Sequence, residues 1–309
     1  PDALRLKGSV LPHVTLPVSF IFFWSLLISI LHERVGLKLE LSNSVVTSIS
    51  VVLGLLLAFR TNTSYDRFWE GRKLFATLIT SIRCLSRIVW IGVSPGISSI
   101  AEKRHFLDLL LAYVVACKHH LRDEFGTHFI DLERLLPPAF HMIRNIGQAE
   151  CARRDYDADI EVYLDPEVCM NLPQEILMHI GLYQERLAQI PGGLEGALYG
   201  TMCAALAQAT DCLTSMERIH STPMPPAYRI HMRQSLMVYC LLLPFTFVDT
   251  LGIYTAFIIL VIAFVLLGIQ EVGSEIEDPF GYDPNDIPLD EYCEELRLEL
   301  RYLVARVPQ

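Results

Sequence analysis

The sequence has 309 residues, of which 52% are hydrophobic and 19% are charged. Its mean hydropathy of +0.36 is too high for an ordinary soluble domain and too low for a chain buried wholly in a membrane. A net charge of −10, without a basic stripe, argues against a nucleic-acid partner.

Two apolar runs near the start of the chain predict two membrane spans. They follow an interfacial, cytosolic segment, residues 1–14. Residues 15–31 carry no charge and reach the roughly 17-residue minimum for a span. A short polar loop at residues 32–43 separates them from the second run, residues 44–59. The first run is interpreted as a retained span, because the basic, apolar and small-residue order of a cleaved signal peptide is missing.

The stretch 51–73 changes from apolar to charged without a turn signal, which predicts one helix passing from lipid depth into water. Helical spacing places Val51, Leu55 and Phe59 on one face. The same stripe then becomes polar, through Asn62, Asp66, Glu70 and Lys73. Such a stripe suits the wall of a conduit, with a narrow dry neck opening into a wetter vestibule. The simpler alternative is that the three apolar residues pack on a neighbouring helix.

The rest of the chain predicts a large helical region followed by two more spans. Residues 60–233 form the helical region, with clear helical periodicity at 74–93, 105–120, 176–190 and 194–220. Residues 126–173 are rich in proline and acids and predict loop with short helices, and the TPMPP sequence at 222–226 breaks the chain. Residues 234–269 contain runs at 235–248, with Pro244 inside, and at 252–269, separated by Asp249 and Thr250. An acidic segment, residues 270–309, follows.

Basic residues gather beside the spans at the ends facing the termini and the helical region. The positive-inside rule therefore places both termini and the region 60–233 in the cytosol. The eight cysteines form no Cys-x-x-Cys pair, which argues against a zinc site and a disulfide framework and favours reduced, partly buried thiols. His119 and His120 are adjacent rather than spaced i, i+4, so they are expected to be solvent-exposed. No enzyme motif is found.

Several short motifs give the chain a resemblance to the bestrophin family. The signature-like segments are 60–62 (RTN), 64–70 (SYDRFWE) and 72–73 (RK). Further matches are 7–10 (KGSV), 222–225 (TPMP) with Ala227 and Tyr228, 243–245 (LPF), and 278–281 (DPFG) with Asp283, Asn285 and Asp286. They bracket nearly the whole chain in the right order, which favours the conduit interpretation of the stripe over simple packing.

The resemblance implies a homopentameric ion channel with its pore on the symmetry axis, lined at the neck by rings of Val51, Leu55 and Phe59. Asn62 and Asp66 would begin the vestibule. Family members are mostly anion channels, and some bacterial relatives conduct cations. Animal relatives carry more aromatic rings at the neck, whereas this chain has Phe59 alone, so anion preference from aromatic ring edges is less assured. A second, cytosolic aperture is implied near Ala197 and Leu198.

The acidic segment after the last span has two interpretations. Asp278, Asp283 and Asp286 fall where animal bestrophins build a calcium clasp, and closely spaced oxygens suit Ca²⁺. Alternatively, the turn simply packs below the membrane, as in calcium-independent relatives. No cofactor other than Ca²⁺ is implied.

We therefore expect an all-α integral membrane protein with four transmembrane helices and a large helical cytosolic region, assembled as a homopentamer. It would conduct chloride and other small anions passively, most simply in the plasma membrane, with itself, the anions and the bilayer as partners. Two alternatives remain: a cation-selective channel of the same fold, and a membrane-anchored scaffold or enzyme without conductance. Arg60 and Arg67 are expected to hold helices together rather than to touch ions.

Overall fold

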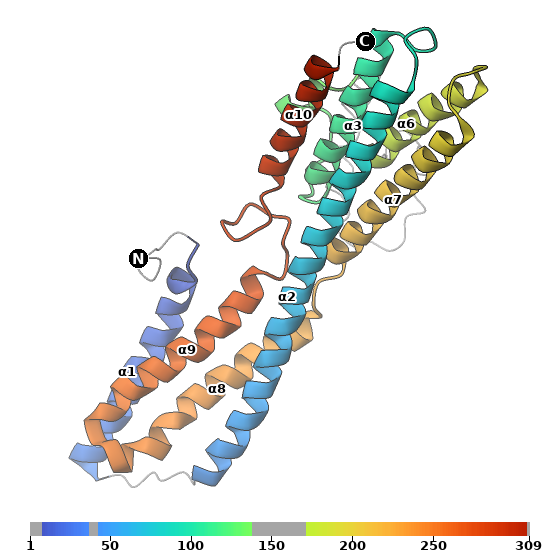
Figure 1. The fold of residues 1–309 in the computed structure, drawn as a ribbon. Coiled ribbons are helices and arrows are strands. Elements are labelled where there is room, and N and C mark those ends of the chain that lie inside the picture. The colour runs from blue at the N-terminus through green and yellow to red at the C-terminus, as the bar shows by residue number, and fades with distance from the viewer. Residues whose placement is uncertain (1–7, 37–42, 138–170, 308–309) are drawn as a thin grey trace, which may run out of the picture. The chain divides into compact units, whose positions relative to one another are not determined.

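The computed structural model describes residues 8–36, 43–137 and 171–307, and within them it contains helices and loops but no strand (Figure 1). The helices are α1 (Leu11–Val35), α2 (Asn43–Arg87), α3 (Ile100–His120), α4 (Ile130–Glu133), α6 (Leu172–Gln189), α7 (Gly196–Ser221), α8 (Pro226–Leu251), α9 (Thr255–Glu275) and α10 (Leu289–Arg306), with short helical turns η2 (Ile88–Gly92) and η4 (Gly252–Tyr254). The predicted all-helical class is confirmed for these residues.

The chain divides into two compact units, which are described separately. Unit 1 comprises Pro1–Glu70 and Thr222–Asp286, and unit 2 comprises Gly71–Ser221 and Ile287–Gln309. Helix α2, 45 residues long, is shared, because its first part belongs to unit 1 and its second part to unit 2.

Unit 1 is built on three helices that pack on one another, α1, α8 and α9. Together with α2 they enclose one apolar core, to which each helix contributes residues at helical spacing. These residues are Val14, Val18 and Ile21 of α1, Val46, Leu53 and Leu57 of α2, Met232, Leu236, Cys240 and Leu243 of α8, and Ile259, Ala263 and Leu267 of α9. Each helix thus buries one stripe and leaves the opposite face, also largely apolar, on the outside.

The connection between α8 and α9 is a tight helical hairpin. Helix α8 continues through Pro244 and through Asp249 and Thr250, where the sequence predicted the break. The helix ends only at Leu251, because the next residue, Gly252, adopts a φ of +52°, which favours glycine. The indole nitrogen of Trp24 on α1 donates to the carbonyl of Leu241, 3.1 Å away, and fixes α8 one turn before the proline.

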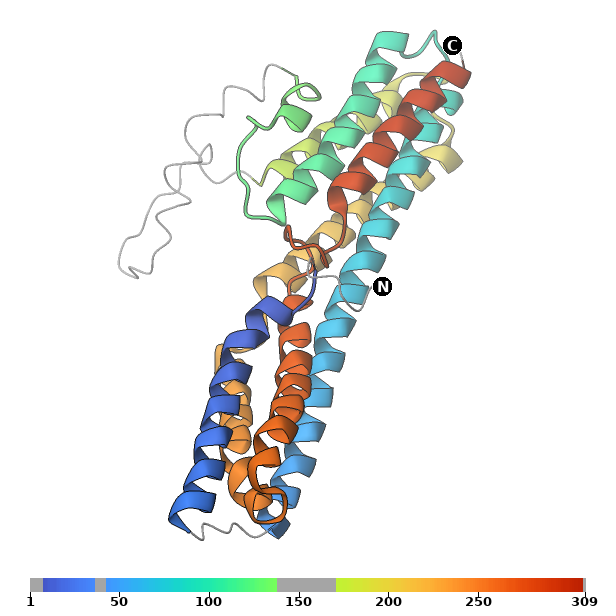
Figure 2. The same ribbon diagram turned by 90° about the vertical axis from the view of Figure 1, so that its left-hand side faces the viewer.

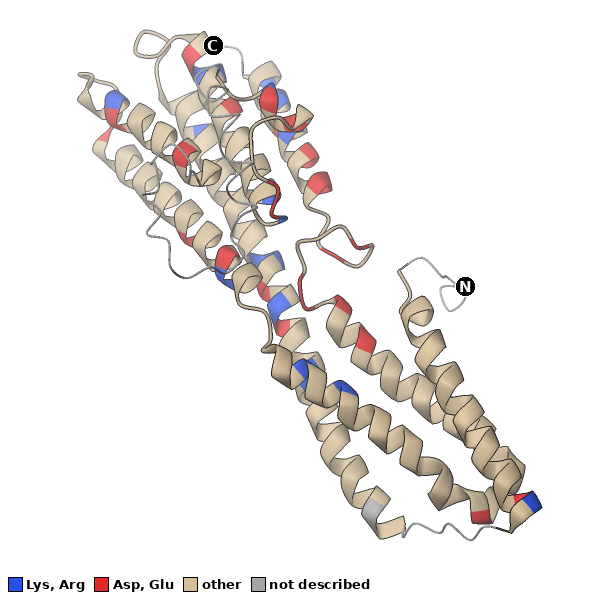
Figure 3. Ribbon diagram, turned by 180° about the vertical axis from the view of Figure 1, so that it is seen from behind, with Lys and Arg blue, Asp and Glu red and all other residues tan. Residues whose placement is uncertain are grey.

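Three helical stretches in the described residues are long and apolar enough to cross a membrane: Leu11–Val35, Val46–Gly92 and Pro226–Glu275. The third contains both α8 and α9. Figure 3 shows that lysine, arginine, aspartate and glutamate are nearly missing from the middle of α1, α8 and α9 and cluster near the ends of these helices. This distribution suits a surface that faces hydrocarbon.

Unit 2 is organised around α3, which packs against α6, α10 and α4 (Figure 2). From Leu109 to His119 every residue of α3 is buried, as expected for a helix covered on all sides. A capping box formed by Ser99 and Glu102 begins the helix. The hydroxyl of Tyr113 donates to the carbonyl of Ala209 on α7, 2.8 Å away, so α3 is also tied to α7.

Candidate functional site

The residues predicted to form a neck lie on one uncovered face of α2. Val51, Leu55 and Phe59 are 68%, 56% and 57% exposed in the single chain. Leu53 and Leu57, on the opposite face of the same helix, are buried in the core of unit 1. Helix α2 therefore packs one apolar stripe within the chain, and a second apolar stripe remains available for contacts outside the single chain.

The uncovered stripe becomes polar toward the middle of α2. Asn62 and Asp66, the predicted vestibule residues, are both exposed, and Glu70 is half-buried. These positions follow Phe59 at three- and four-residue steps on the same continuous helix, so they share its face. The helix thus presents apolar side chains followed by an amide and a carboxylate along one line.

Behind this stripe, a buried arginine joins α2 to the end of α9. The side chain of Arg60 has no exposed area, and its Nη2 donates to the Ser274 hydroxyl, 2.7 Å away. Its counter-charge is Glu277, whose carboxylate lies 3.8 Å away and is itself buried. Gly273 lies beside this contact, and a Cβ there would meet Thr61 and Arg60 at 3.8 to 4.0 Å, an ordinary van der Waals distance. The pair is therefore a desolvated charge contact within unit 1.

Glu277 also holds the segment that leads into α8. Its Oε1 accepts from the backbone N–H of Met224, 3.0 Å away, while Arg67 donates to the carbonyls of Glu277 and Thr222 at 3.0 and 2.7 Å. The prediction that Arg60 and Arg67 hold helices together is confirmed by these contacts. Together they fix α2, α9 and the proline-rich 222–226 segment to one another.

The predicted aperture residues lie at the start of α7, in unit 2. Ala197 is exposed, whereas Leu198 is half-buried and packs beside Gly92, where an added Cβ would lie 3.4 Å from its Cδ1. Their side chains therefore differ in role: Leu198 contacts η2 at the end of the α2 segment, and Ala197 faces outward.

The acidic turn after α9 brings two of its three predicted aspartates together. The Asp286 carboxylate accepts from the backbone N–H of Asp283, 2.8 Å away, and the Asp286 N–H returns a bond to the Asp283 carbonyl. Burial, together with the nearby carboxylates of Asp283, Asp278 and Glu275, raises the pKa of Asp286 to about 6. Across the residues that the structure describes, no group of three or more histidine, cysteine or acidic side chains is arranged to hold a metal ion. One oxygen of Asp286 is thus engaged by the Asp283 N–H, and the calcium clasp stays a prediction, since backbone oxygens can also serve as ligands in such a site.

The calcium interpretation is testable on currents. A working clasp would give currents that rise with calcium and lose that response when Asp283→Ala and Asp286→Ala are combined. The geometry leads us to expect equal currents with and without calcium in the parent protein. Calcium activation of the parent, lost in the double variant, would reverse this expectation.

A buried charge network in unit 2 was not predicted from the sequence. Lys118 donates to Asp131 and Asp290 at 2.6 and 2.8 Å, and His119 places one ring nitrogen 2.5 Å from Glu124 and the other 3.0 Å from Asp131. The expectation that His119 is solvent-exposed is wrong, because its side chain is only 8% exposed. Its partners lie 5 and 12 residues along the chain, Glu124 in the loop that follows α3 and Asp131 in α4, where no local pattern reveals them.

Burial alone would raise the pKa of Asp131, but hydrogen bonds from His119 and Lys118 outweigh it and hold that pKa well below its usual range. The pKa of Asp290 is lowered in the same way by Lys118 and Arg122. Because both folded pKa values are depressed, these carboxylates stabilise unit 2 above their unfolded pKa of about 4, and the contribution is lost as pH falls further.

Replacing Lys118 with methionine is expected to destabilise unit 2 by about 2 kcal/mol at pH 7, because two charge-assisted hydrogen bonds are lost. The variant should also lose stability less steeply below about pH 4, since Asp131 and Asp290 then have less to lose on protonation. Thermal unfolding as a function of pH measures both effects. Lys73→Met, at an exposed position, is the matched control, and equal effects of the two substitutions would contradict the prediction.

Comparisons with known proteins extend over nearly the whole chain. A family model described as the bacterial and fungal bestrophin protein matches residues 3–302. A voltage-dependent anion channel-forming protein of Synechocystis sp. is 38% identical over 308 residues, covering 99% of this chain and 91% of that relative. One from Nostoc sp. is 36% identical over 309 residues, covering 99% and 92%. The crystal structure of a bacterial bestrophin homolog from Klebsiella pneumoniae has a TM-score of 0.76 at 26% identity, covering 96% of this chain and 100% of that chain.

Proposed function

Because this chain belongs to the bacterial and fungal bestrophin family, we propose that it forms a homopentameric membrane channel that conducts chloride and other small anions passively. Membership of this family indicates a membrane channel rather than an enzyme. The names of the Synechocystis and Nostoc relatives support the choice of anions.

The observation that carries the proposal is the uncovered apolar stripe on α2. A single helix encloses no pore, but five copies around an axis would stack rings of Val51, Leu55 and Phe59 into a narrow neck. Their exposure in the single chain supports this arrangement, because the packed core of unit 1 leaves them uncovered and the same stripe continues into Asn62 and Asp66, as a pore lining would. Apolar rings of this kind can gate a pore by dewetting.

The remaining parts of the pathway follow from the same arrangement. Asn62 and Asp66 begin the vestibule below the neck, and Ala197 with Leu198 forms a cytosolic aperture. Four spans cross the membrane, two within residues 15–59 and two within residues 234–269, since α8 and α9 form a hairpin. Residues 1–14, 60–233 and 270–309 then lie in the cytosol, with both termini, and the plasma membrane is the proposed location.

A cation-selective channel of the same fold is the second candidate, and a specific observation favours it. The exposed side chain that follows Phe59 and Asn62 on the stripe is the carboxylate of Asp66, which five subunits would repeat as an acidic ring. The neck itself is aliphatic at Val51 and Leu55, so it contributes little discrimination between ions of opposite sign.

The decisive experiment is the reversal potential of the purified protein in planar bilayers across a KCl gradient. A value near the chloride equilibrium potential supports the anion channel. A value near the potassium equilibrium potential would mean that the acidic vestibule sets the ion selectivity, and it would favour the second candidate. The absence of current under all voltages and calcium concentrations would contradict both.

The assembly is measured independently of currents. We expect native mass spectrometry in detergent to give five times the chain mass of 35.0 kDa. A stable monomer or dimer would contradict a pore shared by five subunits, since the stripe would then face no enclosed space.

A further inference from the structure

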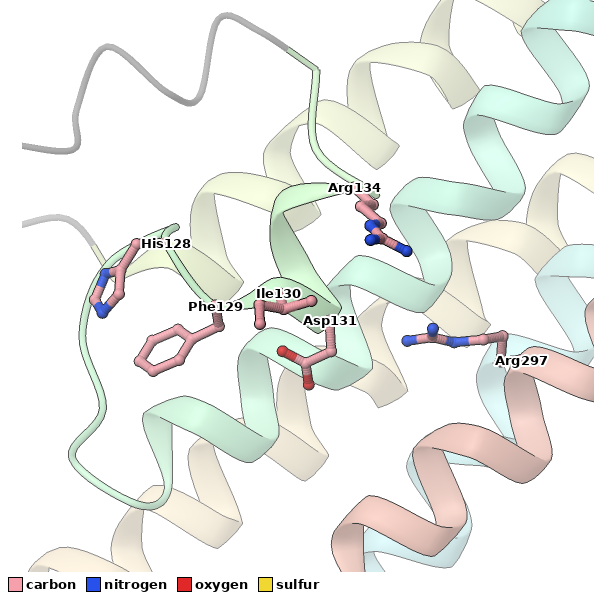
Figure 4. Close-up of a pocket in the computed structure, with 6 residues that line it drawn as sticks. All are labelled: His128, Phe129, Ile130, Asp131, Arg134 and Arg297. Carbon is pink, nitrogen blue, oxygen red and sulfur yellow. The ribbon is translucent and has the colours of Figure 1, made fainter.

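Unit 2 contains a pocket of about 510 Å³ between the 128–134 segment and α10, and none of the residues proposed for the ion pathway lines it. Figure 4 shows the side chains that line it: His128, Phe129, Ile130, Asp131, Arg134 and Arg297. We propose that this pocket binds a small organic phosphate, with Arg134 and Arg297 holding the phosphate group. The proposal concerns ligand binding and stands apart from ion conduction.

The carboxylate that lines the pocket, Asp131, does not neutralise the two arginines, because it already contacts Lys118 and His119. Asp131 accepts from Lys118 at 2.6 Å and lies 3.0 Å from the Nε2 of His119. Lys118 also donates to Asp290 at 2.8 Å, and Arg122 donates to the other oxygen of Asp290 at 2.9 Å. The two cations Lys118 and Arg122 thus balance the two carboxylates Asp131 and Asp290.

The positive charge of Arg134 and Arg297 is additional to this balanced network. Arg134 is exposed, and the ion pair that Arg297 forms in the described part of the chain is a long one, 3.4 Å to the half-exposed carboxylate of Glu294 on its own helix. In Figure 4 the two guanidinium groups extend from different segments toward the same space beside Asp131. Two converging guanidinium groups are suited to a dianion with several acceptor oxygens, which a phosphate group supplies.

The opposite wall of the pocket is apolar and fixed in place. The ring of Phe129 is stacked between the imidazoles of His119 and His128, with centroid distances of 4.0 and 4.4 Å. Ile130 beside it is 76% exposed. A pocket of this volume is far larger than a chloride or a free phosphate ion needs, so the apolar wall predicts an organic group attached to the phosphate.

The test is isothermal titration calorimetry of the full chain in detergent with phenyl phosphate, whose ring and dianion match the two walls. We expect saturable binding, at least several-fold tighter than inorganic phosphate. Arg134→Gln and Arg297→Gln should each weaken it about tenfold or more, because a charge-assisted hydrogen bond is lost. Arg104→Gln is the matched control, an exposed arginine of α3 that does not line the pocket, and should leave binding unchanged.

Several outcomes would overturn the proposal. These are no saturable binding of phenyl phosphate, equal weakening by Arg104→Gln, or binding that survives both pocket substitutions. Succinate bound more tightly than phenyl phosphate would overturn the choice of phosphate, and inorganic phosphate bound equally well would overturn the organic group. Arg134→Lys keeps the charge at an exposed position without disturbing the fold, and it should bind more tightly than Arg134→Gln. Because no current is measured, failure here is distinguishable from failure of the channel proposal.

Discussion

Glu277→Gln is expected to destabilise unit 1 by about 3 kcal/mol, the largest effect of any single substitution considered. The amide keeps the shape of the side chain and can still accept from Met224, but it removes the counter-charge of a guanidinium that has no exposed area. Breaking a buried ion pair on one side costs more than the pair contributes, because the remaining charge stays desolvated. The thermal midpoint of the purified protein in detergent measures the loss.

A matched control is available two residues earlier, at Glu275, the last residue of α9. The carboxylate of Glu275 accepts from the Asn285 amide at 2.9 Å, which a glutamine at 275 can also do, so Glu275→Gln should change stability little. Removing both buried charges, in Arg60→Met with Glu277→Gln, should recover part of the loss. If the double variant loses more stability than the two single variants lose together, the stability of this region depends on something other than charge balance.

Phe59→Ala is expected to raise single-channel conductance several-fold. Each of the five subunits would lose the largest side chain of its neck stripe, and the pore would widen at that ring. The substitution removes a side chain that is 57% exposed in the single chain, so it leaves the packed core intact. Its effect should therefore appear in conductance and gating rather than in stability. Single-channel recordings in planar bilayers, with thermal midpoints measured in parallel, separate these two readouts.

Leu53→Ala is the control for position on the helix. Leu53 lies on the opposite face of α2, buried in the core of unit 1, so its truncation should lower the thermal midpoint and leave conductance unchanged. Val51→Ala, on the stripe, should increase conductance. Equal conductance for Phe59→Ala and the parent protein would move the constriction off this stripe, and an equal rise in conductance for Leu53→Ala would remove the assignment of faces.

The parts of the site that lie on one helix were predictable from the sequence. The shared face of Val51, Leu55 and Phe59 follows from helical periodicity alone, because a continuous helix of 45 residues keeps the same spacing whatever packs against it. The role of Arg60 and Arg67 was also predictable, since arginines next to an apolar run must find acceptors. The pentamer, the neck and the aperture remain predictions that the single chain does not test.

The features that were missed depend on contacts between distant segments. Lys103 follows two serines and an acid in an ordinary first turn, yet it is fully buried and donates to the carbonyls of Val93 and Trp90 at the end of η2. In the sequence, His119 is one of two adjacent histidines predicted to be exposed. In the structure its two ring nitrogens face Glu124 and Asp131. In both cases the partner is set by the path of the loop, which the residue pattern does not specify.

The burial of Lys103 and Lys118 has a practical consequence for chemical labelling. The sequence contains five lysines, at positions 7, 38, 73, 103 and 118, and among the three in the described residues Lys73 is exposed. Amine-reactive cross-linkers therefore find few targets on this protein, and a weak ladder of linked species would reflect scarce amines rather than scarce neighbours. Reagents that couple carboxylates, or a cysteine introduced at an exposed position, are the better choice for joining subunits covalently.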